Sequence, residues 1–230
     1  MGASGGPNVV LDGLIHSYDV SDKVSYSGSL QGQIIKTIND LVGSSNGSVA
    51  SSPTFDTGSL GTDFSIVMDG SDDNIDIGDI GDVFGTSFAV VMWFNTDDVD
   101  NRQEYIGQYQ NSNNWWRWGN DEIDNWEIDV QDSGTRTVSV NPDWTVVANQ
   151  WVHVACSRNG ATWNFYKNGE IDGTGDDDST VPDVAASVKI GSATGEEFGG
   201  KFTSVQIYNR YLTTAEIRQN YNATKKRFGL

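Results

Sequence analysis

The chain has 230 residues, of which 32 are acidic and 14 basic, and its formal net charge is −18. A surface this acidic repels phosphate backbones and anionic lipid, so the charge argues against nucleic-acid and membrane-surface partners. The charge is also segregated. Residues 218–230 carry four basic and no acidic side chains, so the preceding part of the chain carries a net charge of −22.

The other totals favour a folded domain of short strands. With 8 Trp, 8 Tyr and 9 Phe the chain is too aromatic for a disordered protein. Its 26 Gly against 4 Pro are typical of many strands joined by tight turns. The single cysteine, Cys156, lies in an apolar run and is expected to be a buried structural residue. The N-terminus has no signal-peptide pattern, and no apolar run is long enough for a membrane span.

In chain order, alternating or continuous apolar runs predict a series of strands. The central run, Phe88–Phe94, is apolar on both faces, as is typical of a strand that is covered on both sides. Asn168-Gly169 predicts a two-residue hairpin turn. The predicted strands are Leu14–Tyr18, Phe64–Met68, Phe88–Phe94, Tyr105–Tyr109, Trp126–Val130, Thr135–Val140, Trp151–Ser157, Thr162–Lys167, Ser187–Ile190 and Phe202–Tyr208.

One helix is predicted, from Thr214 to about Asn222. Thr213 and Glu216 have the spacing of a capping box, and Ile217 with Tyr221 gives the helix one apolar stripe. The pattern predicts an all-β protein, a two-sheet antiparallel sandwich with one short C-terminal helix. Residues 1–230 are expected to form one domain, with 218–230 as its basic helix end and tail.

Several segments, in order along almost the whole chain, carry a resemblance to a known family. They are 6–14, 25–26, 52–55, 68–75, 150–154, 165–169, 207–217 and the tail 220–230. Together they resemble the laminin-G-like jelly-roll domain of bacteriophage virion proteins, within the concanavalin A-like lectin/glucanase superfamily. The resemblance implies a non-enzymatic virion structural protein, a capsid decoration, fibre or tail-associated protein. Such a protein is made in the host cytoplasm without a signal peptide and is carried on the particle surface.

The densest acidic cluster is a candidate metal site. Asp69, Asp72, Asp73 and Asp76 lie close together in a Gly-containing segment, and Ca²⁺ prefers six to eight oxygen ligands. Structural calcium is common in domains similar to this one, which favours Ca²⁺ as a cofactor. The alternative is a solvated acidic turn whose carboxylates cap backbone amides. The sequence also departs from the family pattern, because Lys201 begins a segment where similar domains have acidic residues.

An aromatic stretch is the candidate carbohydrate-binding site, because exposed indole faces stack on sugar rings and amides bind sugar hydroxyls. Neighbours on a strand face opposite ways, so Trp115 and Trp116 are not both expected in the core of a sandwich. The alternative is that alternate Trp residues point inward as core. The predicted site residues are Trp115, Trp116, Trp118, Asn113, Asn114, Asn120 and Asp121.

A possible enzyme motif occurs just after this stretch. Residues 122–127 fit the E-x-D-x-x-E letters of laminarinase-type glycosidases, and 127–132 nearly fit them. Such chemistry needs two carboxylates about 5–5.5 Å apart. Alternation would place Glu127 and Asp129 on one face of a strand. The preferred interpretation is an acidic outer strand face whose Trp126, Ile128 and Val130 point inward, with no catalytic residues.

The basic tail is the last candidate. Lys225, Lys226, Arg227 and Phe228 are predicted to dock on the acidic surface of another virion protein or of a second copy of the chain. The alternative is a frayed terminus. The sequence therefore predicts a virion protein that presents a carbohydrate-binding or adhesive surface to host or environmental glycans. The alternative functions are a free bacterial lectin and a laminarinase-type glycoside hydrolase.

Overall fold

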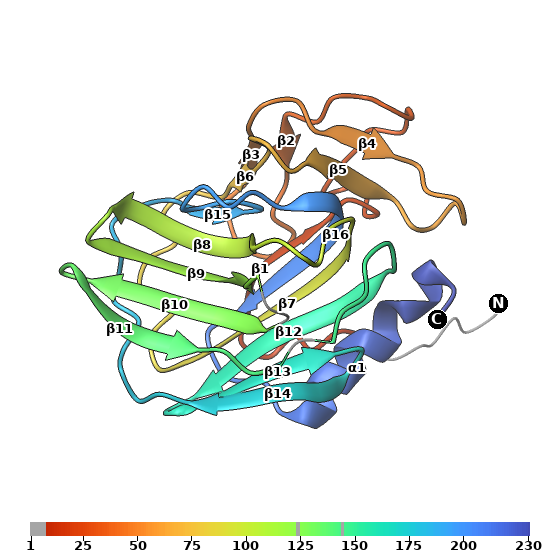
Figure 1. Cartoon of the computed structure of the whole chain (residues 1–230). Coiled ribbons are helices and arrows are strands. Elements are labelled where there is room, and N and C mark those ends of the chain that lie inside the picture. Colours follow the sequence, from red (N-terminus) through yellow and green to blue (C-terminus); the bar gives the residue numbers. More distant parts are fainter. Residues whose placement is uncertain (1–7, 123–124, 144) are drawn as a thin grey trace.

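The structure is a computed structural model that describes residues 8–122, 125–143 and 145–230. It consists of two antiparallel eight-stranded sheets packed face to face, with one helix on the outer side of the first sheet (Figure 1). The predicted fold class is therefore confirmed. Within the described part of the chain, no helix is both long and apolar enough to cross a membrane.

The first sheet, sheet A, has the order β14-β13-β12-β7-β16-β5-β4, and β1 pairs with the second half of β16. Its strands are β1 (Leu14–Asp19), β4 (Thr54–Asp56), β5 (Ser65–Asp69), β7 (Ser87–Thr96), β12 (Val152–Asn159), β13 (Thr162–Lys167), β14 (Glu170–Asp176) and β16 (Gly199–Tyr208). Asn168 and Gly169 both have positive φ and close the predicted β13–β14 hairpin.

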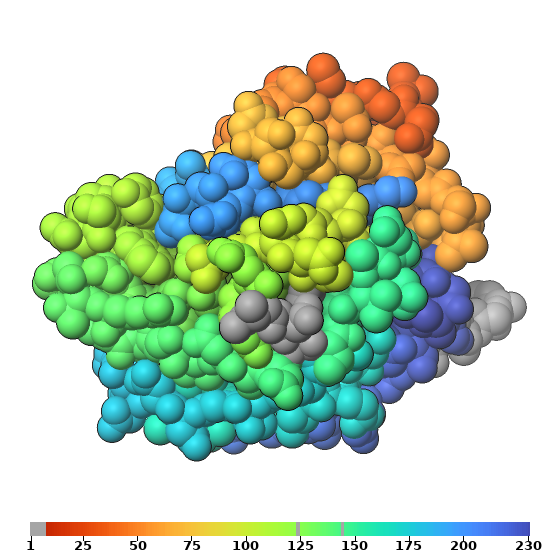
Figure 2. All heavy atoms as spheres, viewed as in Figure 1, coloured from red at the N-terminus to blue at the C-terminus, as the bar shows by residue number. Residues whose placement is uncertain are grey.

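The second sheet, sheet B, has the order β11-β10-β9-β8-β15-β6-β3-β2. Its strands are β2 (Thr37–Ile38), β3 (Gly47–Val49), β6 (Ile75–Asp76), β8 (Gln103–Asn111), β9 (Asn114–Asn120), β10 (Trp126–Asp132), β11 (Thr135–Val140) and β15 (Val188–Ile190). In Figure 1, β8 to β11 lie side by side in one curved layer, and the short strands of the first 80 residues extend the molecule beyond it. Figure 2 shows those N-terminal residues gathered as a block above the rest of the surface.

The main core lies between the sheets and is rich in aromatic side chains. Trp118 and Trp126 stack at 5.8 Å between ring centroids, and Trp126 stacks on Phe165 of the facing sheet at 5.7 Å. A second apolar cluster lies on the outer face of sheet A, where Ile217 of the helix packs near Val91 and Ala155. Sheet A is thus covered on both faces at β7, which explains why Phe88–Phe94 is apolar throughout.

The helix α1 (Thr214–Thr224) begins with the predicted capping box between Thr213 and Glu216, and a short 3₁₀ turn, η1 (Lys225–Phe228), follows it. Both histidines lie in strands. His153 is buried in β12, and His16 in β1 lies 2.7 Å from a carboxylate oxygen of Asp40. Cys156 is also buried, and burial raises the pKa of its thiol well above the usual range, so the residue is structural, as predicted.

Candidate functional site on the outer face of sheet B

Cross-strand pairing of β8 to β11 arranges the outward-facing side chains of sheet B in rows. The first row runs Tyr109, Trp115, Gln131, Arg136 across the four strands. The second runs from Gly107 through Arg117 to Asp129, and the third joins Glu104, Gly119 and Glu127. Residues far apart in sequence therefore form one polar surface with an aromatic end, opposite to the core face.

The aromatic end consists of Tyr109 and Trp115. Tyr109 is 45% exposed, and Trp115 is half-buried beside it in direct cross-strand register. The Arg117 guanidinium lies 5.3 Å from the centroid of the Trp115 ring and supports it from the second row. The two rings form a partly exposed aromatic platform. The sequence pattern marked Trp115 but gave no indication that Tyr109 would be its neighbour.

Two glycines behind this platform allow neighbouring groups to approach the sheet closely. A Cβ on Gly119 would lie 1.9 Å from the carbonyl oxygen of Gln103, and one on Gly107 would lie 2.9 Å from the Ala193 side chain. The loop containing Ala193 and Thr194 folds over Gly107, and both its amides donate to Glu104 Oε2, at 2.6 and 2.7 Å. This loop covers the β8 side of the face, so the charged rows are buried although they point away from the core.

Arg117 is the centre of a buried ion-pair network. Its Nη2 atom lies 3.1 Å from Glu127 Oε2 and 3.1 Å from Asp129 Oδ2, and its Nη1 atom lies 3.5 Å from Glu104 Oε1. Arg102 pairs with Glu127 at 3.0 Å, and Arg136 pairs with Asp129. Buried charges need such partners, so each side chain is held in one orientation. The side chains of Arg136 and Arg102 remain 49% and 27% exposed and form the accessible edge of the network.

The network changes the protonation of one carboxyl. Burial and the neighbouring Asp129 carboxylate raise the pKa of Glu127 to about 7, although Arg117 and Arg102 act in the opposite direction. Glu127 therefore exchanges a proton near neutral pH. Burial opposes the charge of Arg117, but its three carboxylate neighbours raise its pKa overall, so it stays cationic.

Three of the seven residues predicted to bind carbohydrate lie in or beside the platform, and four do not. Trp115 is on the outer face, Asn113 lies in the turn before β9 and Asn114 is the first residue of β9, and both asparagines are linked to the neighbouring hairpin through Ser133 and Gly134.

The prediction was wrong for Trp116 and Trp118, which point into the core with exposures of 2% and 1%. Their strand is buried on its inner face, so alternation forces one Trp of each neighbouring pair inward. Asn120 and Asp121 lie at the far end of β9, where both are buried. Asn120 accepts a hydrogen bond from Tyr105, and Asp121 accepts one from Asn125. These two residues hold a loop in place and do not adjoin the platform.

Of the four aspartates predicted to bind calcium, the structure brings three together. Asp69, Asp72 and Asp73 each place one carboxylate oxygen within 4.8 Å of the others. Asp73 is buried and accepts the backbone amides of Ser52 and Asp69. Burial and the two neighbouring carboxylates raise its pKa. Asp76 is not in this group, and instead accepts the amide of Gly78.

These aspartates adjoin an acidic cleft at the rim of the molecule. The cleft has a volume of about 350 Å³ and lies between Asp69 and Arg102, so it connects the aspartate group with the edge of the Arg117 network. Its other charged lining residues are Asp97, Asp98, Glu196 and Glu197. The rim is thus strongly negative, in contrast to the balanced charges of the outer face.

The acidic outer strand face is present, and its inward partners are as predicted. Trp126, Ile128 and Val130 are buried in the core, and Glu127 and Asp129 share the opposite face. Those two carboxylates are paired with arginines and are only 3% and 2% exposed, although they lie on the outer face. The other members of the glycosidase-like motif include Ile123 and Asp124, which lie outside the described residues, as does Trp144. Glu122 is exposed and lies 3.7 Å from Arg102.

The basic tail docks on its own sandwich, which corrects both sequence interpretations. Phe228 is 7% exposed and stacks on Trp93 and Trp151, with ring centroids 4.2 and 4.6 Å apart. Arg227 pairs with Asp19 of β1 at 2.5 Å. Lys225 lies over the Tyr221 ring, and Lys226 alone of the four is fully exposed. The tail is therefore neither frayed nor free, and Lys226 is the most exposed of the four predicted contact residues.

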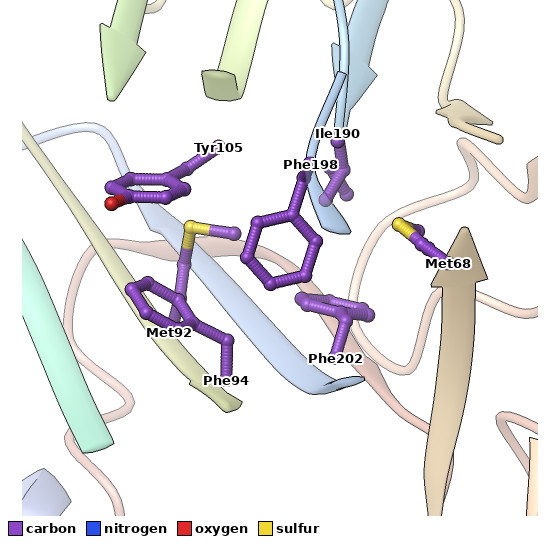
Figure 3. Close-up of a pocket in the computed structure, with 8 residues that line it drawn as sticks. Met68, Met92, Phe94, Tyr105, Ile190, Phe198 and Phe202 are labelled. Atoms are coloured by element: carbon purple, nitrogen blue, oxygen red, sulfur yellow. The ribbon is translucent and has the colours of Figure 1, made fainter. Parts of the chain in front are cut away.

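One enclosed void lies between the sheets and is not a ligand site. Its volume is about 10 Å³, and Figure 3 shows Phe198 between Met92 and Tyr105 on one side and Phe202 and Met68 on the other. A space of this size holds one water molecule at most, and its apolar walls offer that water no partners. The adaptable Met68 and Met92 side chains fill most of the gap.

Comparison with known proteins places this architecture in a family. A sequence model described as the concanavalin A-like lectin/glucanases superfamily (Laminin_G_3) matches residues 69–218. The chain belongs to this superfamily. The matched range contains every residue of the three outer-face rows and the aspartate group. No curated protein matches the chain in sequence.

Solved structures with a similar fold include a domain of an arabinanase and the binding domains of two toxins. Domain 4 of AbnA, a GH43 extracellular arabinanase from Geobacillus stearothermophilus solved with arabinotriose, has a TM-score of 0.64 at 18% identity, covering 90% of this chain and 98% of that one. The binding domain of Paraclostridial Mosquitocidal Protein 1 has a TM-score of 0.68 at 15% identity, covering 92% and 52%. The botulinum neurotoxin serotype D binding domain has a TM-score of 0.63 at 16% identity, covering 91% and 51%. At these identities the likeness shows the shared fold.

Proposed function

We propose that this superfamily member is a non-enzymatic carbohydrate-binding protein whose binding surface is the outer face of sheet B. The observation that carries the proposal is the Tyr109–Trp115 platform, which adjoins fixed polar groups. Aromatic faces stack on the apolar faces of sugars, and the Arg136 guanidinium and Gln131 amide of the same row can bind hydroxyl groups.

Two further observations support a saccharide as the ligand. The accessible Arg136 guanidinium is held by its ion pair with Asp129 of the Arg117 network, so little conformational entropy is lost when Arg136 binds a ligand. A structure with the same fold, AbnA domain 4, was solved with arabinotriose.

Binding to a panel of polysaccharides and arrayed glycans, followed by calorimetry on the strongest ligand, tests the proposal. Trp115→Ala and Tyr109→Ala should each lower affinity by at least about tenfold, or roughly 1.4 kcal/mol. Tyr211→Ala is the matched control, because Tyr211 is 39% exposed and lies just before helix α1, away from sheet B. Equal binding by all four proteins would contradict the assignment of the surface.

We further propose that the protein is a bacteriophage virion component on the particle surface, a capsid decoration, fibre or tail-associated protein. The support is the resemblance of residues 6–14 and 207–230 to virion proteins of this type. Of the four predicted tail contacts, Lys226 is the exposed one, and with the acidic body it offers a contact surface for other virion proteins or further copies. Mass spectrometry of purified particles tests the location, and detection of the protein only in the lysate supernatant would favour a free lectin.

Calcium at Asp69, Asp72 and Asp73 is a separate proposal. Three converging carboxylates supply part of the oxygen shell that Ca²⁺ needs, and a cation would relieve the repulsion that raises the pKa of Asp73. Calcium should raise the melting temperature of the protein but not that of Asp72→Asn. Asp79→Asn is the control, since Asp79 lies nearby but outside the group. The absence of both heat and thermal shift on calcium addition would remove this proposal.

One observation favours the alternative function, a glycoside hydrolase. Glu127 has a pKa of about 7 and lies beside a second carboxylate, as a general acid requires. Against this, Arg102, Arg117 and Arg136 pair with both carboxylates, which leaves no free nucleophile. Release of reducing sugar that is lost in Glu127→Gln would establish the hydrolase and overturn the binding proposal.

A further inference from the structure

A second surface cleft lies on the opposite sheet, where it is bounded by five separate parts of the chain. It has a volume of about 540 Å³. Its base contains Asn95 of β7 and Lys201 of β16, which are cross-strand partners on the outer face of sheet A. Asn149 and Trp151 form one wall, and Phe228 of the docked tail adjoins it.

The aromatic wall is held in place by the tail. Trp151 is half-buried and packs against Phe228 at an interplanar angle of 39°, so part of the indole remains open to the cleft. The tail is fixed in turn by the hydrogen bond from Thr62 Oγ1 to the carbonyl oxygen of Arg227. The wall is thus preorganised by contacts outside the cleft.

Some polar side chains of the cleft already have hydrogen-bond partners within the protein, and others do not. Lys201 donates to Asp56 at 2.6 Å, and Asp63 accepts the backbone amides of Ser59 and Leu60. For the side-chain amides of Asn95 and Asn149, by contrast, the described part of the chain contains no hydrogen-bond partner. Asn149 is held in the left-handed region at φ 61° by its own backbone amide, which donates to the carbonyl oxygen of Thr96.

This arrangement selects a class of ligand. The cleft contains two carboxylates, Asp56 and Asp63, and one ammonium group, Lys201, so its net charge is −1. The whole chain has a net charge of −18, and both charges disfavour an anionic ligand. The carboxylates are already bonded to an ammonium group and backbone amides, which disfavours a bare cation. Two free amides beside an indole instead suit a neutral molecule with several hydroxyl groups and one apolar face, and the volume fits such a small ligand.

We infer that this cleft is a second binding site, for a neutral monosaccharide unit, formed by Trp151, Asn95 and Asn149 on the face of the molecule opposite to the Tyr109–Trp115 platform. The inference does not depend on the platform. If both sites bind, one molecule can bridge two glycan chains, and such a bridge gains avidity without any new contact.

Ligand-observed saturation-transfer NMR tests the inference with the methyl glycosides of glucose, galactose, mannose and N-acetylglucosamine. The protein used is Trp115→Ala, in which binding at the platform is weakened, and all cleft variants are compared in this background. At least one neutral glycoside should show transfer, and Asn95→Ala and Asn149→Gly should each reduce it at least fivefold. Glycine is chosen at 149 because it keeps the left-handed backbone while removing the amide.

Asn159→Ala is the matched control, because Asn159 is an exposed asparagine at the opposite end of β12. It should leave the transfer unchanged, and all the variants should unfold at the same temperature. The inference is overturned if none of the four glycosides shows transfer, or if transfer persists equally in both cleft variants. Either result leaves the platform proposal intact, because that proposal is measured on protein with Trp115 in place.

Discussion

Replacing Glu127 by glutamine should stabilise the protein at alkaline pH relative to acid pH. The reason is the raised pKa of Glu127, which burial and the Asp129 carboxylate shift from 4.5 to about 7. Between these two pH values the folded protein binds more protons than the unfolded chain, so the free energy of unfolding falls as pH rises. Above the pKa that Glu127 has in the folded protein, the full loss of unfolding free energy caused by its ionisation is present. Glutamine removes this loss because it resembles the protonated acid.

The size of the effect follows from the shift. One pKa unit corresponds to about 1.4 kcal/mol, so ionised Glu127 lowers the free energy of unfolding by about 3 kcal/mol at pH 8 and by under about 1 kcal/mol at pH 5. The Glu127 side chain is only 4% exposed, so solvent screening does not reduce this value substantially. The stability of Glu127→Gln relative to the native protein should therefore be greater at pH 8 than at pH 5, by roughly 2–3 kcal/mol.

Urea unfolding followed by tryptophan fluorescence at both pH values measures this difference. Glu122→Gln is the control, since the Glu122 side chain is 66% exposed and its substitution should give the same small effect at both pH values. If Glu127→Gln loses relative stability between pH 5 and pH 8, then Glu127 is stabilised as an anion by Arg102 and Arg117, and the reasoning fails.

Three further substitutions test the packing of the fold by equilibrium unfolding. Phe228→Ala should lower the free energy of unfolding by about 3–5 kcal/mol, because the side chain is buried between Trp93 and Trp151; a loss below about 1 kcal/mol would mean that the tail is undocked in solution. Thr213→Ala should remove about 1 kcal/mol with the helix cap, and an unchanged value would exclude the capping box. Gly200→Ala should be strongly destabilising, because φ is 132° and the new Cβ would lie 2.3 Å from the Asn95 carbonyl oxygen; near-native stability would contradict this backbone geometry.

The fold class could be predicted because most of the long strands carry their own pattern. Strand β7 is apolar on both faces, and the capping box of Thr213 and Glu216 begins the helix, so local sequence suffices for both. The short strands β2, β3 and β6 have only two or three residues each, too few to show alternation. Strand β14 was also missed, because its Asp and Gly residues are depleted in strands and it forms an exposed edge.

The candidate site could be predicted only in part, because it depends on register between strands. Alternation shows that Trp115 and Trp116 face opposite ways, but it does not show which of them faces the core. The pairing of Tyr109 with Trp115, and of Arg117 with Glu127 and Asp129, joins separate strands and appears only in three dimensions. The tail was misjudged for the same reason, since the indoles that receive Phe228 come from β7 and from the residue just before β12.

The position of β16 has a consequence for how the protein is made on the ribosome. This strand is almost the last element of the chain, yet it lies inside sheet A, between β7 and β5, and also pairs with β1. Until residues 199–208 have emerged, these three strands lack their shared neighbour and present unpaired edges that other nascent chains can join. Sheet A is therefore completed only after nearly the whole chain has been synthesised, which makes this stage of synthesis the one most dependent on protection by chaperones.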